Sequence, residues 1–195
     1  MKRLFTLFCA AGLLLALAAC GRQAEEPAST LKPHVFSAET ETIIDLLTEA
    51  NEAFCLYDYD VDETIQSCRT TLWSYENGAW VSKAQSAGNL SAQQGQFGFY
   101  LDRNGSYTGY DIQEDGHTAY CYEGSLPVFE ESGSSVNQNE QEIVPGQEIC
   151  LYVRLRAPDG ADTVAFSTES FRSYPCSAGC AVTITFYDTL LPEDP

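Results

Sequence analysis

Cysteine is the residue type whose number and spacing could most readily do chemistry in this chain. The sequence contains eight cysteines, six of which follow residue 20: Cys55, Cys68, Cys121, Cys150, Cys176 and Cys180. An even number in an exported chain indicates disulfides. Cys176 and Cys180 are close enough in sequence for a local bridge, and Cys55 and Cys68 fall on consecutive predicted strands. Cys121 and Cys150 are the pair left by elimination.

The cysteines also allow two other interpretations. Unpaired thiols are common core residues, because free cysteine is among the most buried residue types. Thiol chemistry is the second alternative, although Cys176 and Cys180 enclose three residues and redox motifs enclose two on a βαβ framework. Zinc sites use close cysteine pairs at both ends of the motif, and this spacing is absent. The cysteines therefore predict no metal or cofactor.

Carboxylates alternate along one segment, Asp58-Tyr59-Asp60-Val61-Asp62. The spacing suggests a calcium loop, but an EF-hand needs glycine at its sixth position and glutamate at its twelfth. Those positions hold Glu63 and Arg69. The segment is typical of the wet side of a strand end, with an irregular calcium site at Asp58, Asp60 and Asp62 as a weak alternative.

No residue of the chain is predicted to be catalytic. The two histidines are His34 and His117, and neither has the neighbours that a nucleophile and its base require. Motifs of the G-x-S-x-G, H-E-x-x-H and Walker types are absent. A hydrolase with a pair of carboxylates stays possible, because 28 acidic residues offer many chance pairs.

Aromatic residues are concentrated in the first half of the chain. Tyrosine and tryptophan combine apolar area with a polar tip, as recognition surfaces do. Several of them, including Tyr57 and Tyr59, are expected on wet strand faces. A ligand-binding surface is therefore predicted at Trp73, Trp80, Tyr107 and Tyr110. The alternative is that strands favour aromatic residues, which pack across neighbouring strands.

The amino end has the order of parts of an export signal. Lys2 and Arg3 precede an uncharged stretch from Leu4 to Ala19, which is too short to span a bilayer comfortably. Leu17-Ala18-Ala19-Cys20 follows, and this sequence resembles the lipobox of bacterial lipoproteins. The resemblance implies cleavage after residue 19 and a diacylglycerol on the sulfur of Cys20. A plain secretory signal is the alternative.

The rest of the chain is expected to form one domain. Residues 20–36 are predicted to be a lipidated cysteine and a flexible tether, and residues 37–195 a single domain. Ile43, Leu46 and Leu47 recur at helical spacing and predict a helix that extends to Ala50. Ser37 could cap the start of this helix. A strand over residues 42–47 is the alternative. Residues 124–141 are polar and predict an exposed loop, either functional or an insertion.

Two-residue periodicity predicts the fold class. Apolar residues alternate over about nine segments: 53–61, 64–75, 79–83, 95–102, 106–112, 117–122, 147–156, 162–167 and 180–188. Hairpin signals lie at Asn77-Gly78, Asn104-Gly105 and Asp159-Gly160. The sequence thus predicts an all-β, antiparallel β-sandwich, immunoglobulin-like or jelly-roll-like, with one short amino-terminal helix. The domain resembles uncharacterised bacterial β-sandwich lipoproteins, without a motif that transfers functional residues.

Charge limits the partners. The formal net charge of −18 repels phosphate backbones and so argues against nucleic acid. An anionic membrane surface also repels this body, so a lipid would have to hold it at the membrane. The sequence therefore predicts a membrane-anchored, extracytoplasmic, non-catalytic binding module for a glycan, a peptide or an envelope protein. The alternatives are an extracytoplasmic enzyme and a structural spacer in the envelope.

Overall fold

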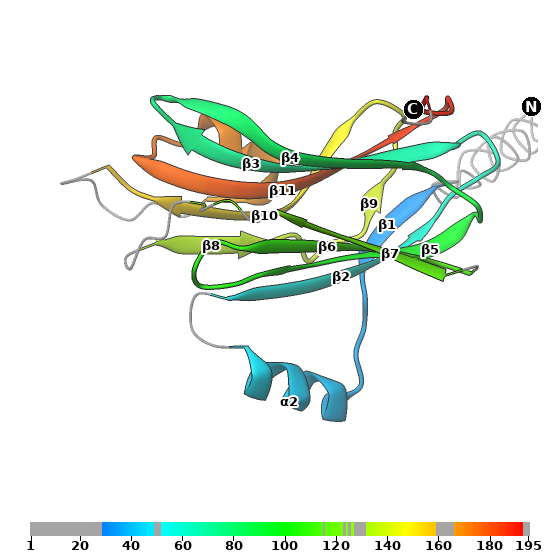
Figure 1. Ribbon diagram of the computed structural model, residues 1–195, viewed down its shortest axis with the longest axis horizontal. Coiled ribbons are helices and arrows are strands. Elements are labelled where there is room, and N and C mark those ends of the chain that lie inside the picture. Colours follow the sequence, from blue (N-terminus) through cyan, green and yellow to red (C-terminus); the bar gives the residue numbers. More distant parts are fainter. Residues whose placement is uncertain are drawn as a thin grey trace, which may run out of the picture.

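Two antiparallel sheets packed face to face make up the described part of the protein (Figure 1). The structure is a computed structural model that describes residues 29–48, 52–114, 116–122, 124, 126, 132–158 and 166–192. The predicted signal peptide, Cys20 and the first residues of the tether lie outside the described residues. The all-β sandwich predicted from periodicity is confirmed.

The two sheets contain six and five strands. The six-stranded sheet has the order β7-β6-β5-β2-β1-β9, with β1 (Thr30–Pro33), β2 (Ala53–Asp60), β5 (Gln94–Leu101), β6 (Tyr107–Gln113), β7 (Gly116–Tyr122) and β9 (Gln141–Glu142). The five-stranded sheet has the order β4-β3-β11-β10-β8, with β3 (Ser67–Glu76), β4 (Ala79–Asn89), β8 (Gly133–Val136), β10 (Glu148–Arg156) and β11 (Ala178–Tyr187). Helix α2 (Ala38–Leu47) and the 3-10 helix η1 (Thr168–Ser173) lie outside the sheets.

Turn chemistry located two hairpins correctly. Asn77 and Gly78 have φ values of 52° and 84° and join β3 to β4, as a tight hairpin requires. The turn with Gly105 joins β5 to β6. The predicted hairpin at Asp159-Gly160 lies outside the described residues, as does most of the predicted strand 162–167. Three short strands were missed: β1 lies in the predicted tether, β8 in the predicted loop, and β9 begins where that loop ends.

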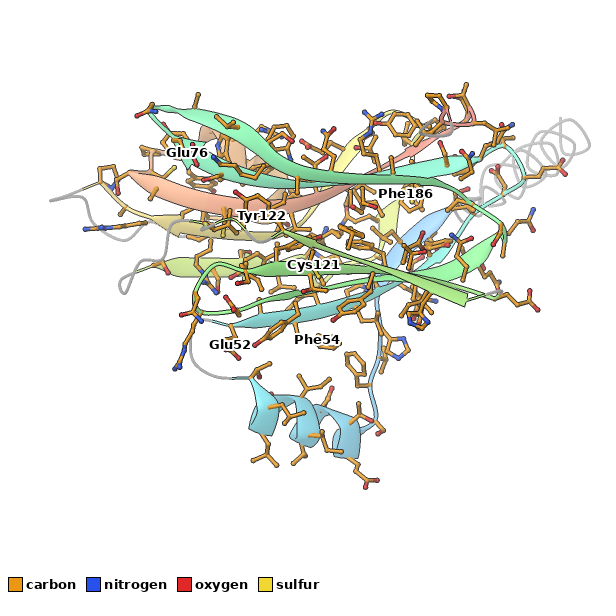
Figure 2. All side chains as sticks on the ribbon, viewed as in Figure 1. Glu52, Phe54, Glu76, Cys121, Tyr122 and Phe186 are labelled. Atoms are coloured by element: carbon orange, nitrogen blue, oxygen red, sulfur yellow. The ribbon has the colours of Figure 1, made fainter. Side chains whose placement is uncertain are left out.

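The core between the sheets contains tyrosines as well as aliphatic residues. Phe186, Phe99 and Leu151 are fully buried there, and Figure 2 shows Phe186 between the sheets. Tyr57 and Tyr59 are only 1% and 2% exposed, which corrects the expectation that both lie on wet faces. The Tyr57 hydroxyl donates to the carbonyl oxygens of Asn137 and Leu151, at 3.0 and 2.9 Å. Burial of the ring is favourable because these acceptors satisfy the polar tip.

Strand β10 is buried on both of its faces. A bulge between Cys150 and Tyr152 interrupts its alternation, so Leu151 and Tyr152 both join the main core. Cys150, Val153 and Leu155 face the other way, into a second apolar cluster on the outer face of the five-stranded sheet. Helix η1 covers this cluster. The five-stranded sheet is therefore packed on both sides.

Helix α2 begins as predicted but packs differently. Ser37 caps it by accepting a hydrogen bond from the Thr40 amide at 3.2 Å. None of its side chains is buried: Leu46 is 79% exposed and Leu47 is 74% exposed. Figure 1 shows α2 standing outside the six-stranded sheet. Within the described ranges, no helix has the length and apolar character needed to cross a membrane.

Candidate functional site

The outer face of the six-stranded sheet carries a row of three aromatic rings, which we call the ring face: Phe54, Tyr100 and Tyr110. Each alternates with residues that point into the core, and each is half-buried. Phe54 on β2 lies directly opposite Tyr100 on β5. Tyr110, on the next strand β6, lies opposite Gly98 of β5 and is therefore diagonal to Tyr100. Figure 2 shows Phe54 on the side of β2 that faces α2. The ring of Phe36 lies 6.1 Å from that of Phe54.

Gly98 shapes the middle of this face. A Cβ atom at Gly98 would come within 2.9 Å of Leu56 Cδ1. The missing side chain therefore lets Leu56 lie over β5, where it fills the space that a larger residue would occupy. The surface between Phe54 and Tyr110 is consequently apolar and has no side chain at Gly98 to interrupt it.

Polar side chains lie beside the ring face: four are on β2 and β5, and the others are on β1 or just past the ends of β1 and β6. We call this group the polar corner: Lys32, His34, Asp58, Asp60, Gln94, Gln96 and Glu114. All of them except His34 line an open depression of about 600 Å³, together with Tyr59 and Gly95. This volume falls within the range of about 300–1,000 Å³ that is usual for ligand sites.

Hydrogen bonds link five members of the polar corner: His34, Asp58, Asp60, Gln94 and Gln96. Gln96 Nε2 donates to Asp58 Oδ1 at 2.8 Å, and Gln94 Nε2 donates to Asp60 Oδ2 at 2.9 Å. Nδ1 of His34 lies 2.9 and 3.0 Å from the two carboxylate oxygens of Asp58. These cross-strand pairs follow from the register, because Asp58 is opposite Gln96 and Asp60 is opposite Gln94. The polar atoms are therefore positioned before any ligand arrives.

The weak calcium candidates are not gathered around one point. Asp58 and Asp60 lie on the outer face of β2 and pair with glutamines. Asp62 lies in the following turn, where its carboxylate accepts from the Thr64 amide at 2.8 Å and from the Thr64 hydroxyl. These hydrogen bonds lower the pKa of Asp62. Within the described ranges, no group of three or more histidine, cysteine, aspartate or glutamate side chains could hold a metal ion.

The four aromatic residues predicted as a ligand surface do not lie together on one surface. Tyr107 is only 1% exposed, and its hydroxyl lies 3.5 Å from that of Tyr120 inside the sandwich. Trp73 and Trp80 lie on the opposite sheet, in the second apolar cluster. Of the four, Tyr110 alone is part of the ring face. The sequence pattern identified the residue types but not the sheet or the side to which each belongs.

Trp73 and Trp80 are engaged in packing. The guanidinium carbon of Arg172 lies 4.2 Å from the Trp73 ring centroid, so the cation covers the indole face. Arg172 also makes a two-pronged ion pair with Glu148: Nη2 donates to both carboxylate oxygens at 2.9 Å, and Nε donates to Oε2 at 3.3 Å. The Trp80 ring meets that of Phe171 edge to face, with centroids 4.9 Å apart. These contacts attach η1 to the sheet.

The predicted disulfides are wrong. All six cysteines that were paired in the prediction are free thiols. Cys55 lies in β2 and Cys68 in β3, on different sheets, because consecutive strands cross from one layer to the other. Cys180 belongs to the main core, whereas Cys176 belongs to the second cluster on the far side of the five-stranded sheet. The alternative of unpaired structural thiols describes these residues.

Cys121 and Cys150 are also kept apart. Cys121 is exposed on β7 of the six-stranded sheet, and Cys150 is buried on β10 of the other sheet. Burial raises the pKa of Cys55 and Cys68 to about 12 and that of Cys180 to about 11, so these thiols stay protonated at neutral pH. Such thiols are poor nucleophiles, which does not favour the thiol-enzyme alternative.

Most of the candidate site was absent from the sequence prediction. Phe54, Tyr100, Gln94 and Gln96 come together only through the pairing of β2 with β5. Alternating polar residues at Gln94 and Gln96 were a usable signal for an outward face. Choosing the face of β2 required knowledge that Tyr57 is buried.

Comparisons with family models, with curated proteins and with solved structures found no match to this chain. A half-buried row of rings beside prearranged hydrogen-bonding groups is a combination typical of binding surfaces.

Proposed function

We propose that the protein is a lipid-anchored, extracytoplasmic binding module that contacts its ligand with the ring face and the polar corner. The observation that carries the proposal is the outward row Phe54, Tyr100 and Tyr110 next to a depression lined by paired aspartate and glutamine side chains. Aromatic area supplies affinity, and prearranged polar atoms supply orientation at little entropic cost. The lipobox-like amino end supports the anchored location.

Anchoring is tested by metabolic labelling with a fatty-acid analogue. The full chain should incorporate the label, and Cys20→Ala should not. Each CH₂ group buried in the bilayer adds about 0.8 kcal/mol, so two or three acyl chains hold the protein firmly. Cys121→Ala is the matched control, because Cys121 is the exposed thiol among the described cysteines. Equal labelling of wild type and Cys20→Ala would remove the anchor from the proposal.

Binding is tested by co-sedimentation of the purified full chain, in detergent, with an insoluble bacterial envelope fraction. The variant Phe54→Ser/Tyr100→Ser/Tyr110→Ser should lose at least tenfold in apparent affinity. Tyr187→Ser is the control, because Tyr187 is a half-buried tyrosine on the other sheet. Circular dichroism should show that both variants remain folded. Unchanged sedimentation of the triple variant would contradict the assignment of the ring face.

A further inference from the structure

The three positions of the ring face form a staggered row across β2, β5 and β6. Neighbouring strands are about 4.8 Å apart, so Phe54 and Tyr100 lie side by side across β2 and β5. Tyr110 is diagonal to Tyr100 on the next strand, at a distance of roughly 7–8 Å. The three residue positions follow a line that crosses the strands obliquely. A ligand that matches it must present repeated flat, weakly apolar faces along an extended chain.

A chain of pyranose sugars presents such faces. The axial C–H groups on one side of a pyranose carry a slight positive charge and stack on the negative face of an aromatic ring. Successive sugars can therefore contact successive rings, and Leu56 beside Gly98 adds apolar surface between them.

The polar corner supplies the complement to sugar hydroxyls. Vicinal hydroxyls each donate and accept, so they need an acceptor and a donor at neighbouring positions. Two pairs place a carboxylate beside an amide: Asp58 with Gln96, and Asp60 with Gln94. A carboxylate pair fixed by Gln96 and Gln94 keeps this arrangement without reorganisation when a ligand binds.

Charge selects among carbohydrates. Asp58, Asp60 and Glu114 line the depression, and Lys32 is the one lysine or arginine in that lining. A formal net charge of −18 adds long-range repulsion of acidic polymers. Sugars that carry carboxylates, sulfates or phosphates are therefore disfavoured, whereas neutral sugars and cationic amino sugars are not.

An extended peptide fits the same face less well. Peptides that bind to sheets gain most affinity by adding a strand at a free edge. Strands β2 and β5 are internal to their sheet, with β1 and β6 as their outer neighbours. The backbone groups beneath Phe54 and Tyr100 are thus already paired. The face offers side chains only, which suits a ligand recognised by stacking and hydroxyl contacts.

From these observations we propose that the ring face and polar corner bind a carbohydrate chain without acidic groups. The rings stack on its sugar faces, and the aspartate–glutamine pairs hold its hydroxyls at the end that enters the depression. This inference rests on the binding function proposed above and names its ligand class.

The test is isothermal titration of the purified full chain, in detergent, with a panel of oligosaccharides. The probes are hexamers of β-linked glucose, xylose, mannose and N-acetylglucosamine, a chitosan hexamer, and hexagalacturonate as the acidic probe. At least one neutral or amino-sugar hexamer should bind, with hexagalacturonate at least tenfold weaker. Tyr110→Ala should weaken that binding about tenfold or more, which corresponds to loss of one stacking contact of about 1.4 kcal/mol.

Matched variants separate stacking from folding. Tyr110→Phe keeps the ring and should stay within about threefold of wild type, and Tyr187→Ala on the other sheet should not change the affinity. Gln96→Ala removes one amide of the polar corner and should cost several-fold. Preferential binding of hexagalacturonate, equal binding by Tyr110→Ala, or a panel without any binding would overturn the proposal.

The failure of this inference differs from failure of the proposed function. A protein ligand at the same face would be identified by three results together. The triple ring variant would lose envelope co-sedimentation, no sugar of the panel would bind, and protease treatment of the envelope fraction would abolish binding. That result would retain the binding function and reject the carbohydrate. Envelope binding that is unaffected by the triple variant would reject the ring face itself.

Discussion

The two outer faces of this sandwich differ in how their aromatic residues are covered. On the five-stranded sheet, η1 covers an apolar cluster, and Phe171 is only 4% exposed. Arg172 of η1 stacks on Trp73 and forms an ion pair with Glu148, which fastens η1 over this cluster. On the six-stranded sheet, Phe54 and Tyr110 stay half-buried, and the nearby helix α2 buries none of its side chains. Both faces carry aromatic residues, but one cluster is closed and the other is open.

This contrast teaches how to separate aromatic residues that stabilise a fold from those available to a ligand. Trp73 and Trp80 have the residue type most enriched at binding hot spots. Their faces and edges are occupied by Arg172 and Phe171. The row on the other sheet consists of phenylalanine and tyrosine instead, and Phe54 and Tyr110 in it are half-buried. Whether a ring can contact a ligand depends on what covers it. The segment that covers Trp73 and Trp80 is η1, which lies far from them in sequence.

The largest expected effect tests the closed face. Phe171→Ala should lower the free energy of unfolding by about 3–5 kcal/mol, because it leaves a cavity under η1 and removes the ring contact with Trp80. Phe54→Ala on the open face should cost roughly 1 kcal/mol, since much of its ring already contacts water. Urea denaturation of both variants measures the difference. Equal costs would mean that the two faces do not differ in packing.

A smaller effect concerns the ion pair that closes the cover. Glu148→Gln weakens a two-pronged pair with Arg172 and keeps a hydrogen-bond acceptor for Thr183. The expected loss is about 1 kcal/mol, because both partners are partly exposed and water screens the pair. The loss should shrink in high salt. Glu76→Gln, which disrupts the surface pair with Lys83, is the control and should leave the unfolding midpoint unchanged.

Asp111, between the sheets, is a carboxylate that accepts a hydrogen bond from an amide, whereas Glu148 pairs with a guanidinium. Burial is the largest cause that raises the pKa of Asp111, and the hydrogen bond from Gln113 at 3.1 Å only partly opposes it. The side chains around it include Tyr59, Cys68 and Tyr120, which are neutral at acidic and neutral pH. Among the described residues, no lysine or arginine contributes to the pKa of Asp111, so no opposite charge offsets the loss of hydration when Asp111 ionises.

The sign of the pH dependence follows from this shift. A raised folded-state pKa means that the folded protein binds more protons, so stability falls as the pH rises from 3.8 through the raised pKa. Asp111→Asn should remove that slope and be more stable than wild type at pH 7. Asp62→Asn is the opposite control, because hydrogen bonds from Thr64 lower the pKa of Asp62 and its contribution is lost as the pH falls. Denaturation at several pH values measures both slopes, and parallel curves for wild type and Asp111→Asn would contradict the prediction.

Local signals in the sequence were sufficient for the fold class and insufficient for the site. Asn77-Gly78 fixes a hairpin because both residues accept positive φ, whatever the rest of the chain does. Alternation shows that β2 has two faces, but it does not say which one is buried. Tyr57 is inside because Asn137 and Leu151, more than 75 residues away, supply acceptors for its hydroxyl. The predicted pairs Cys55–Cys68 and Cys121–Cys150 failed for the same reason, since the sheet to which each strand belongs is a long-range property. Cys176 and Cys180 instead lie on opposite sides of the five-stranded sheet.

The smallest expected effect concerns α2, the helix beside the open face. Its Leu46 and Leu47 fit the helical spacing of a buried stripe, yet both are more than 70% exposed. Leu46→Ser should therefore change the free energy of unfolding by less than about 0.5 kcal/mol, as is usual at the surface. Leu151→Ala in the main core, where the side chain is 0% exposed, should cost about 2–5 kcal/mol. A loss above 1 kcal/mol for Leu46→Ser would show that α2 packs on the six-stranded sheet in solution, and that this face is then covered like its counterpart.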